Sequence, residues 1–281
     1  MRILLPLMII LLAGCLPDNR QPHSATHGKL YIIGGGNRPQ SMLTEMASLA
    51  GISTGKYIYV LPMASSEPDS AILWAKEDFS SAGIKQVYGF NFRKGEEQPP
   101  ERLDSVRNAG MVYISGGVQS RFMDAVLGTP LYDAVHAAYN NGAVIAGTSA
   151  GAAVMSKKMI TGEQMKHSGE DAGYTTIEAD NIEIKEGLGL IRDVIIDQHF
   201  IKRQRLNRLV TGSIENPDEI CIGIDESTAI IVEGQSAKVT GSGQVVVIVN
   251  RTKNKKVLNG LLGSEGLELS VYLPGDSFAM K

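Results

Sequence analysis

The sequence predicts an α/β fold, in which a mostly parallel sheet carries helices on both faces and an antiparallel extension follows toward the C-terminus. In the first half, short apolar runs alternate with helix-like stretches. Near-continuous apolar strands separated by helices are typical of a parallel sheet covered on both faces. After Ser227 the strand-like runs follow one another with turns at Gly234, Gly241, Gly243 and Asn250, which is typical of antiparallel hairpins.

The alternating part of the chain predicts the central sheet and its helices. Strands are expected at Leu30–Ile33, Tyr57–Leu61, Val87–Phe90, Met111–Ile114 and Ala143–Ala146, and helices at Gln40–Leu49, Asp69–Ser81, Glu101–Asn108, Ser120–Leu127 and Leu131–Asn140. Glycine turns follow three of these strands, at Gly34-Gly35-Gly36, Gly116-Gly117 and Gly147-Thr148-Ser149. Because ligands lie beyond the carboxyl ends of parallel strands, we expect the three loops to converge on a functional site.

The second half predicts more strands and no separate domain. Gly189–Asp197 and Glu219–Asp225 resemble further central strands. The runs expected to extend the same sheet in antiparallel fashion are Ala229–Val232, Ala237–Thr240, Val245–Val249 and Leu267–Tyr272. Residues 29–281 are therefore predicted to form one α/β domain.

The N-terminus has the pattern of an export signal. Arg2 precedes an apolar run from Ile3 to Ala13, which is too short to span a bilayer and fits a secretory signal. Leu12-Ala13-Gly14-Cys15 resembles the bacterial lipoprotein box, which implies a signal peptide at residues 1–14, lipidation of Cys15 and a tether at residues 15–28. The protein is thus expected to be exported and lipid-anchored to a bacterial membrane, on its periplasmic or extracellular side. The second of the two cysteines, Cys221, lies in an apolar run and is expected to pack in the core.

Composition and motif spacing exclude several kinds of partner. A net charge of −3 and a pI near 6.0 argue against nucleic acid, which calls for a basic surface. The triple glycine lacks the Gly-x-Gly-x-x-Gly spacing of dinucleotide sites, and no Cys/His set has zinc-like spacing. We expect neither a cofactor nor a metal, and the sequence leaves a homodimer open.

The most informative motif is Gly147-Thr148-Ser149-Ala150-Gly151, which follows an apolar strand and precedes a run of small residues. A sharp strand-to-helix turn strains the serine backbone and exposes its hydroxyl, and only small flanking residues permit that bend. A capping serine at a glycine-rich junction is the alternative interpretation. The pattern favours Ser149 as a nucleophile.

A serine nucleophile needs a base and an acid that orients it. Of the five histidines, His199 ends an apolar strand on the expected side of the sheet and is the favoured base. Asp225 and Glu226 end another strand, and Asp197 is a third candidate acid; spacing does not choose among them. The chain order Ser, His, acid differs from the order in lipase-type α/β-hydrolases.

Two further features complete the predicted site. Backbone N–H groups at Gly116-Gly117, together with that of Ala150, could bind a developing oxyanion. A basic helix is expected at Ile201–Leu209, directly after His199. Its guanidinium groups could clamp a substrate carboxylate in bidentate fashion.

These segments together resemble the cyanophycinase-like serine peptidases, relatives of dipeptidase E. The matching motifs are Gly147–Ala152, Tyr113–Gln119 with Arg121, Asp197–Phe200 with Arg203, Arg205 and Arg208, and Gly223–Ala229. The resemblance implies a class I glutamine-amidotransferase-like fold, with Ser149 as nucleophile, His199 as base, Glu226 as acid, and Gly117 and Ala150 at the oxyanion. It places Gln119, Asp197, Gln198, Arg203, Arg205 and Arg208 in the substrate pocket.

The resemblance also implies an activity. Family members cleave cyanophycin, a polyaspartate with arginine on each side-chain carboxyl, into β-aspartyl-arginine dipeptides. The basic residues would grip carboxylates while Asp197 met the arginine side chain. The export signal departs from intracellular polymer-mobilising enzymes, so an aspartyl dipeptidase acting on short peptides is an alternative, and a lipid-anchored binding protein is another.

Overall fold

The computed structural model describes residues 27–167 and 173–280, so Cys15 and the signal segment lie outside the described residues. Its strands and helices, in chain order, are β1 (Leu30–Ile33), α1 (Gln40–Leu49), the 3₁₀-helix η1 (Ile52–Thr54), β2 (Ile58–Leu61), α2 (Pro68–Ser81), β3 (Val87–Gly89), α3 (Pro100–Arg107), β4 (Met111–Ile114), α4 (Gln119–Val126), α5 (Pro130–Asn140), β5 (Val144–Thr148), α6 (Ala150–Ala153), β6 (Lys158–Gln164), β7 (Ile182–Glu186), β8 (Val194–Gln198), α7 (Leu206–Glu215), β9 (Ile220–Ile224), β10 (Thr228–Glu233), β11 (Ser236–Gly241), β12 (Val245–Asn250), β13 (Lys256–Leu258), β14 (Leu261–Gly263), β15 (Leu267–Tyr272) and β16 (Ser277–Ala279).

The main sheet has eight strands in the order β16-β11-β10-β1-β5-β4-β2-β3. The five strands from β1 to β3 in this order pair in parallel, whereas β10, β11 and β16 add to β1 in antiparallel fashion. The predicted mostly parallel sheet with an antiparallel C-terminal extension is thus confirmed. The carboxyl ends of β1, β4 and β5 lie together because these strands are parallel and in register.

Alternate residues of each central strand face opposite layers of helices. On one face Tyr31, Val60 and Tyr113 pack with buried residues of α1 and α2. On the other face Ile32 and Ile114 belong to the cluster that includes buried residues of α3, α4 and α5. Both faces are therefore covered, as the near-continuous apolar strands predict.

Proline begins three of the helices. Pro68, Pro100 and Pro130 each occupy the first helical position, where the missing N–H is not needed and the fixed φ suits a helix. Helices α2, α3 and α5 therefore each begin at a proline, one residue before their predicted starts.

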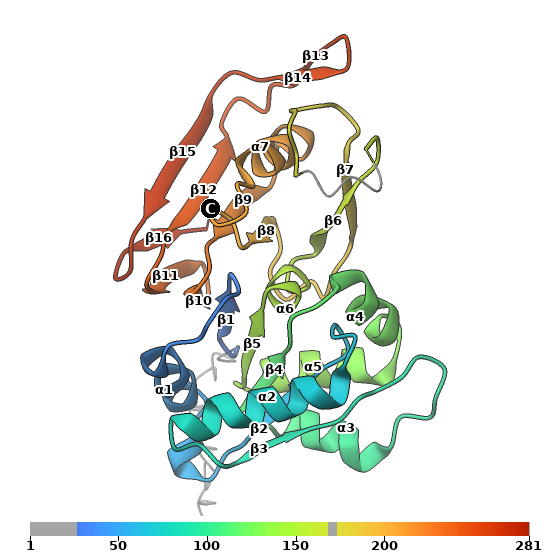
Figure 1. Ribbon diagram of the computed structural model, residues 1–281, viewed down its shortest axis with the longest axis vertical. Helices are drawn as coiled ribbons and strands as arrows, with labels where there is room; N and C mark the ends of the chain where they lie inside the picture. Colours follow the sequence, from blue (N-terminus) through green and yellow to red (C-terminus); the bar gives the residue numbers. More distant parts are fainter. Residues whose placement is uncertain (1–26, 168–172, 281) are drawn as a thin grey trace, which may run out of the picture.

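A second sheet departs from the prediction. β8 and β9 pair in parallel with each other and join β12 and β15 in a separate four-stranded sheet, in the order β15-β12-β9-β8. They are not further strands of the main sheet, and only part of the C-terminal region extends that sheet. In Figure 1 the second sheet and α7 lie above the main sheet. One face packs with Leu209 of α7, and the other joins the main core through residues such as Ile222 and Val245.

The predicted basic helix at Ile201–Leu209 is also corrected. Residues 201–204 form turns, and α7 begins only at Leu206. Asp225 Oδ1 accepts hydrogen bonds from the backbone N–H groups of Ile201 and Lys202, and Gln204 has a left-handed φ of 53°. These constraints hold the segment in turns directly after His199.

Several strands had no prediction. β6 and β7 form an antiparallel ribbon, and β13 and β14 form a short hairpin.

Within the described residues, no helix combines the length and the apolar character needed to cross a bilayer. Cys221 is a free, fully buried thiol in β9, as expected.

Candidate active site

Ser149 sits in a strained turn between β5 and α6. Its backbone has a φ of 55° and a ψ of −111°, a conformation that L-residues rarely adopt. The turn is tight, since a Cβ atom on Gly147 would collide with the carbonyl group of Gly151. The small residues around Ser149 are therefore a steric requirement of the bend.

His199 lies between Ser149 and a carboxylate. Its Nε2 atom is 2.9 Å from Ser149 Oγ, and its Nδ1 atom is 2.7 Å from Glu226 Oε1. His199 follows β8 and Glu226 follows β9, so the second sheet supplies both partners. The three side chains form a continuous hydrogen-bonded chain with the geometry of a nucleophile, a base and an orienting acid.

The three candidate acids have different contacts. Glu226 reaches the imidazole, whereas Asp225 accepts the N–H groups of the turn after His199. Asp197 accepts hydrogen bonds from Arg208. The structure thus brings Glu226 alone of the three to His199.

The surroundings favour a neutral imidazole and an ionised carboxylate. Burial, assisted by the charges of Arg203 and Arg205, lowers the pKa of His199, although Glu226 acts in the opposite sense. The hydrogen bond with His199 lowers the pKa of Glu226. Near neutral pH His199 can therefore accept a proton from Ser149.

The glycine loop after β1 connects all three parts of the site. The carbonyl oxygens of Ile33, Gly34 and Gly35 accept hydrogen bonds from the N–H groups of Ser149, His199 and Ser227, at 3.0, 2.7 and 2.8 Å. The sequence predicted that this loop converges on the site but assigned it no role.

Gly35 and Gly36 allow the close approach of His199 and Glu226. A Cβ atom on Gly35 would collide with the imidazole of His199, and one on Gly36 would lie 2.8 Å from Glu226 Cβ. Both glycines also have positive φ values, of 111° and 71°. Glycine at a strand's carboxyl end was the signal that could have assigned them this role.

Backbone donors lie beside Ser149. A Cβ atom on Gly116 would be 3.4 Å from Ser149 Cβ, so the loop containing Gly117 adjoins the nucleophile. Within the described part of the chain, the N–H groups of Gly117 and Ala150 have no hydrogen-bond acceptor. Free donors of this kind can stabilise a developing oxyanion.

Two of the predicted substrate residues form an ion pair inside the protein. Asp197 and Arg208 are buried and bind each other through Nε (2.8 Å) and Nη2. The family resemblance places both residues in the substrate pocket, but their charges are already paired with each other within the protein.

Gln119 is buried beside Arg208. A Cβ atom on Gly162 would be 3.7 Å from both Gln119 Nε2 and Arg208 Nη1. The Gln119 amide nitrogen donates to the carbonyl groups of Ile160 and Thr161, at 2.9 and 2.6 Å. These contacts join α4 to β6 next to the arginine cluster, which consists of Arg203, Arg205 and Arg208.

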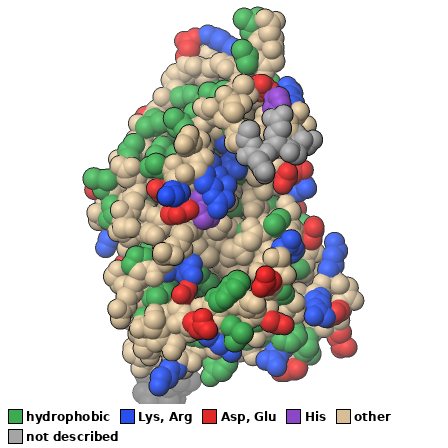
Figure 2. Space-filling model, in the orientation of Figure 1, with side chains coloured by type: hydrophobic (Ala, Val, Ile, Leu, Met, Phe, Trp, Pro, Cys, Tyr) green, Lys and Arg blue, Asp and Glu red, His purple; other side chains and the backbone are tan. Residues whose placement is uncertain are grey.

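Arg203 and Arg205 are more accessible than Arg208. Arg203 is exposed, and Arg205 is half-buried with its Nη1 atom 2.7 Å from Gln198 Oε1. Burial, followed by the charge of Arg208, lowers the pKa of Arg205 to about 10. Figure 2 shows Lys and Arg side chains gathered beside a histidine in a hollow between the two halves of the molecule.

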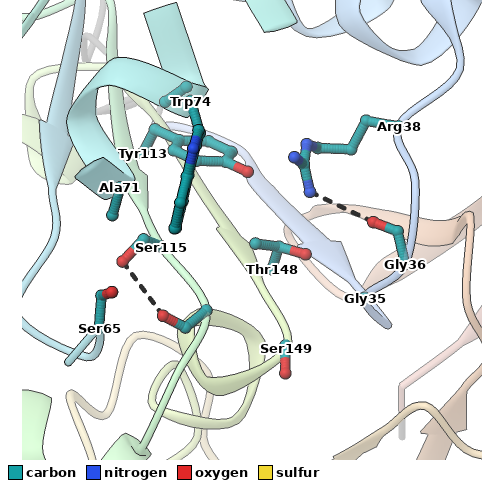
Figure 3. Close-up of a pocket in the computed structure, with 12 residues that line it drawn as sticks. Gly35, Gly36, Arg38, Ser65, Ala71, Trp74, Tyr113, Ser115, Thr148 and Ser149 are labelled. Carbon is teal, nitrogen blue, oxygen red and sulfur yellow. Dashed lines mark hydrogen bonds between the residues drawn. The ribbon is translucent and has the colours of Figure 1, made fainter. Parts of the chain in front are cut away.

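A pocket borders Ser149 on the side of α2, away from the arginine cluster (Figure 3). It includes Arg38, Trp74, Tyr113 and Thr148, none of which the sequence predicted as site residues. Among the residues that the structure describes, no group of three or more His, Cys, Asp or Glu side chains could hold a metal ion.

Comparison with known proteins identifies the family. The model of peptidase family S51 matches residues 30–240. The chain belongs to this family. It is therefore a serine-type peptidase, and its relatives include cyanophycinases.

Two of these relatives illustrate the extent of the similarity. The cyanophycinase of Synechococcus elongatus is 30% identical over 273 residues, which cover 92% of this chain and 81% of the relative. That of Nostoc sp. is 32% identical over 267 residues, covering 90% and 86%.

Solved structures share the fold of this S51 peptidase. A peptidase from an acI-B1 Actinobacterium superposes with a TM-score of 0.66 at 22% identity, over 91% of this chain and 98% of that one. A Listeria monocytogenes protein assigned to peptidase E gives a TM-score of 0.53 at 16% identity, over 77% and 100%.

Gly35→Ala tests the role of the glycine loop. The added methyl group would displace the imidazole of His199, so we expect labelling of Ser149 by a fluorophosphonate probe to slow by about tenfold or more, as misplacement of catalytic groups does. Gly55→Ala is the matched control, because Gly55 also has a positive φ but no atom within 4 Å of the added carbon. Equal labelling rates in the two variants would contradict this role.

The lowered pKa of His199 predicts the pH dependence of the site. Labelling of Ser149 requires the neutral imidazole, so its rate should fall as the pH drops through a midpoint below 6.5. Glu226→Gln should move this midpoint further down, because the Glu226 hydrogen bond raises the pKa of His199. Glu233→Gln, at an exposed pair with Lys29, should leave it unchanged. A wild-type midpoint above 6.5 would contradict the burial effect.

Proposed function

We propose that this protein is a serine exopeptidase that hydrolyses aspartyl peptides through an acyl-enzyme, with cyanophycin as its substrate. The observation that carries the mechanism is the continuous chain from Ser149 through His199 to Glu226, with distances of 2.9 and 2.7 Å. The similarity to cyanophycinases over most of the chain supports the substrate.

In the first half of the reaction, Ser149 Oγ attacks the scissile carbonyl carbon and its proton passes to His199 Nε2. Glu226 accepts a hydrogen bond from Nδ1–H and stabilises the imidazolium that forms. The N–H groups of Gly117 and Ala150 bind the oxyanion. His199 then gives the proton to the departing amine, the C–N bond breaks, and an ester on Ser149 remains.

In the second half, water attacks the ester. His199 Nε2 takes a proton from the water, and the tetrahedral intermediate again places its oxyanion against the two N–H groups. Collapse returns the proton to Ser149 Oγ and releases the new carboxylic acid. The overall reaction breaks one peptide bond, consumes one water molecule and needs no other reactant.

The arginine cluster supports an anionic substrate. Arg205 and Arg208 carry two positive charges, and Asp197 supplies one negative charge in contact with both. The excess charge lies in a half-buried place, where burial first and the charge of Arg208 second lower the pKa of Arg205 to about 10. A substrate carboxylate beside Arg205, and near the exposed Arg203, would balance this charge and form charge-assisted hydrogen bonds.

We also propose that lipid on Cys15 anchors the peptidase to a membrane after export. The support comes from the sequence, in which an apolar segment ends in Leu12-Ala13-Gly14-Cys15. The anchored enzyme would act on polymer or peptide outside the cytoplasm.

Incubation with cyanophycin tests the reaction. Wild-type protein lacking residues 1–15 should release β-aspartyl-arginine, and Ser149→Ala should lower the rate about 10⁴- to 10⁶-fold, as loss of a nucleophile does in other serine peptidases. Ser236→Ala, at an exposed serine in β11, should match the wild type. Release that survives Ser149→Ala would contradict the mechanism.

The same assay separates the alternatives. Turnover of Asp-X dipeptides without turnover of the polymer would identify an aspartyl dipeptidase. Failure of a serine-reactive probe to label Ser149, together with no hydrolysis, would identify a binding protein.

Replacement of the cysteine tests the anchor. In a bacterial host, the full-length chain should incorporate labelled fatty acid and sediment with membranes, whereas Cys15→Ser should do neither. Cys221→Ser is the control and should retain the label, because this thiol is buried in β9. Equal labelling of the wild type and Cys15→Ser would contradict lipidation at Cys15.

A further inference from the structure

The pocket beside Ser149 is separate from the arginine cluster. It encloses about 260 Å³ and shares Ser149 and Gly116 with the catalytic site. Its wall is formed by Ala71, Trp74 and Ala75 of α2, and the loop after β1 contributes Arg38. None of the arginines that follow His199 lines it. The nucleophile thus has a binding region on the α2 side and another beside Arg205.

Thr148 carries an unpartnered hydroxyl in this pocket. Its side chain is buried, with 6% of the residue exposed, and Oγ1 has no hydrogen-bond partner. A buried hydroxyl without a partner costs stability. Figure 3 shows this hydroxyl and the guanidinium of Arg38 facing each other across the pocket.

Arg38 has donors to spare. Nε and Nη2 donate to Asp78 Oδ2, and Nη1 donates to the carbonyl oxygen of Gly36. A guanidinium has five N–H donors, so one donor on each terminal nitrogen is left without an acceptor among the described residues. Two such donors match the two oxygens of a carboxylate.

The charge of the lining selects an anion. Arg38 is the one side chain in the lining that is charged at neutral pH, because burial raises the pKa of Tyr113 and keeps its phenol neutral. Asp78 holds Arg38 from outside the lining. A guanidinium or ammonium ligand would therefore meet the positive charge of Arg38, and the lining has no carboxylate to bind such a ligand.

The size of the pocket fits a single residue. Pockets for drug-sized ligands have roughly 300–1,000 Å³, and this one is smaller. Ala71 and Trp74 of α2 line it opposite Ser149, which leaves room for about one residue between α2 and the nucleophile. Arg203 is exposed on the other side of the site, where the remainder of a polymer can extend.

We propose that this pocket binds the C-terminal residue of the substrate, with its free α-carboxylate held by Arg38 and the hydroxyl of Thr148. This inference rests on the proposed exopeptidase function and assigns the recognition of the chain end within it. The leaving unit thereby occupies the α2 side of Ser149, and the acyl unit occupies the side of Arg205.

Trp74 is the only tryptophan in the chain and lies in the pocket wall, so its fluorescence reports directly on occupancy. Ser149→Ala protein lacking residues 1–15 is titrated with β-aspartyl-arginine and with the same dipeptide in which the aspartyl α-carboxyl is a carboxamide. We expect both to change the Trp74 emission and the free acid to bind about tenfold more tightly or better, as loss of a charged hydrogen-bond partner predicts. Trp74→Phe should abolish the signal.

Three variants in the same background assign the carboxylate. Arg38→Gln should remove the preference for the free acid. Thr148→Val should weaken binding of the free acid several-fold without lowering the melting temperature, because Oγ1 has no partner to lose. Asp78→Asn disturbs the same ion pair but keeps Arg38, and should keep the preference.

Equal binding of the two dipeptides, a preference that survives Arg38→Gln, or no change in Trp74 emission would each overturn the assignment. Hydrolysis of cyanophycin is scored separately with the wild-type protein. Absence of hydrolysis together with a carboxylate preference at Trp74 would reject the proposed substrate and leave the pocket assignment standing.

Discussion

The site depends on three consecutive backbone carbonyl groups at the end of β1. Ile33, Gly34 and Gly35 accept the N–H groups of Ser149, His199 and Ser227, so one short segment fixes the nucleophile, the base and the neighbour of the acid relative to one another. All three donor residues have left-handed φ values, of 55°, 50° and 54°. Such conformations cost about 1–3 kcal/mol each and persist only where the surroundings hold them. The hydrogen bonds to β1 supply part of that constraint.

This arrangement explains why the chain builds two sheets that meet. Ser149 ends a strand of the main sheet, whereas His199 and Glu226 follow strands of the second sheet. β1 sits in the main sheet between β5 and β10, and its end is the place where both sheets come within reach. Because the two sheets share one hydrophobic core, packing holds the three side chains together, and Cys221, the one cysteine in the described residues, is a free thiol.

Most of the main sheet and the chemistry of the site could be predicted from sequence, because apolar strands with glycine at their carboxyl ends carry a local signal. The division into two sheets could not, since β8 and β9 have the same apolar pattern as central strands. The choice between Asp225 and Glu226 depends on the directions of neighbouring side chains at a turn, which spacing does not contain. Likewise, Asp197 and Arg208 pair with each other, but their sequence positions are equally compatible with contacts to the substrate.

The two binding regions carry positive charge in different ways. Asp78, whose side chain is 38% exposed, pairs with Arg38 from outside the pocket lining, so Arg38 remains the one charged side chain of the lining and keeps two free donors. Arg205 shares Asp197 with Arg208 and sits in a half-buried place with excess positive charge. An anion there gains Coulomb energy as well as hydrogen bonds. In the proposed function, cyanophycin offers a free carboxylate on the arginine of every unit and another at the chain end, so it would supply an anion to each region while its scissile bond crosses Ser149.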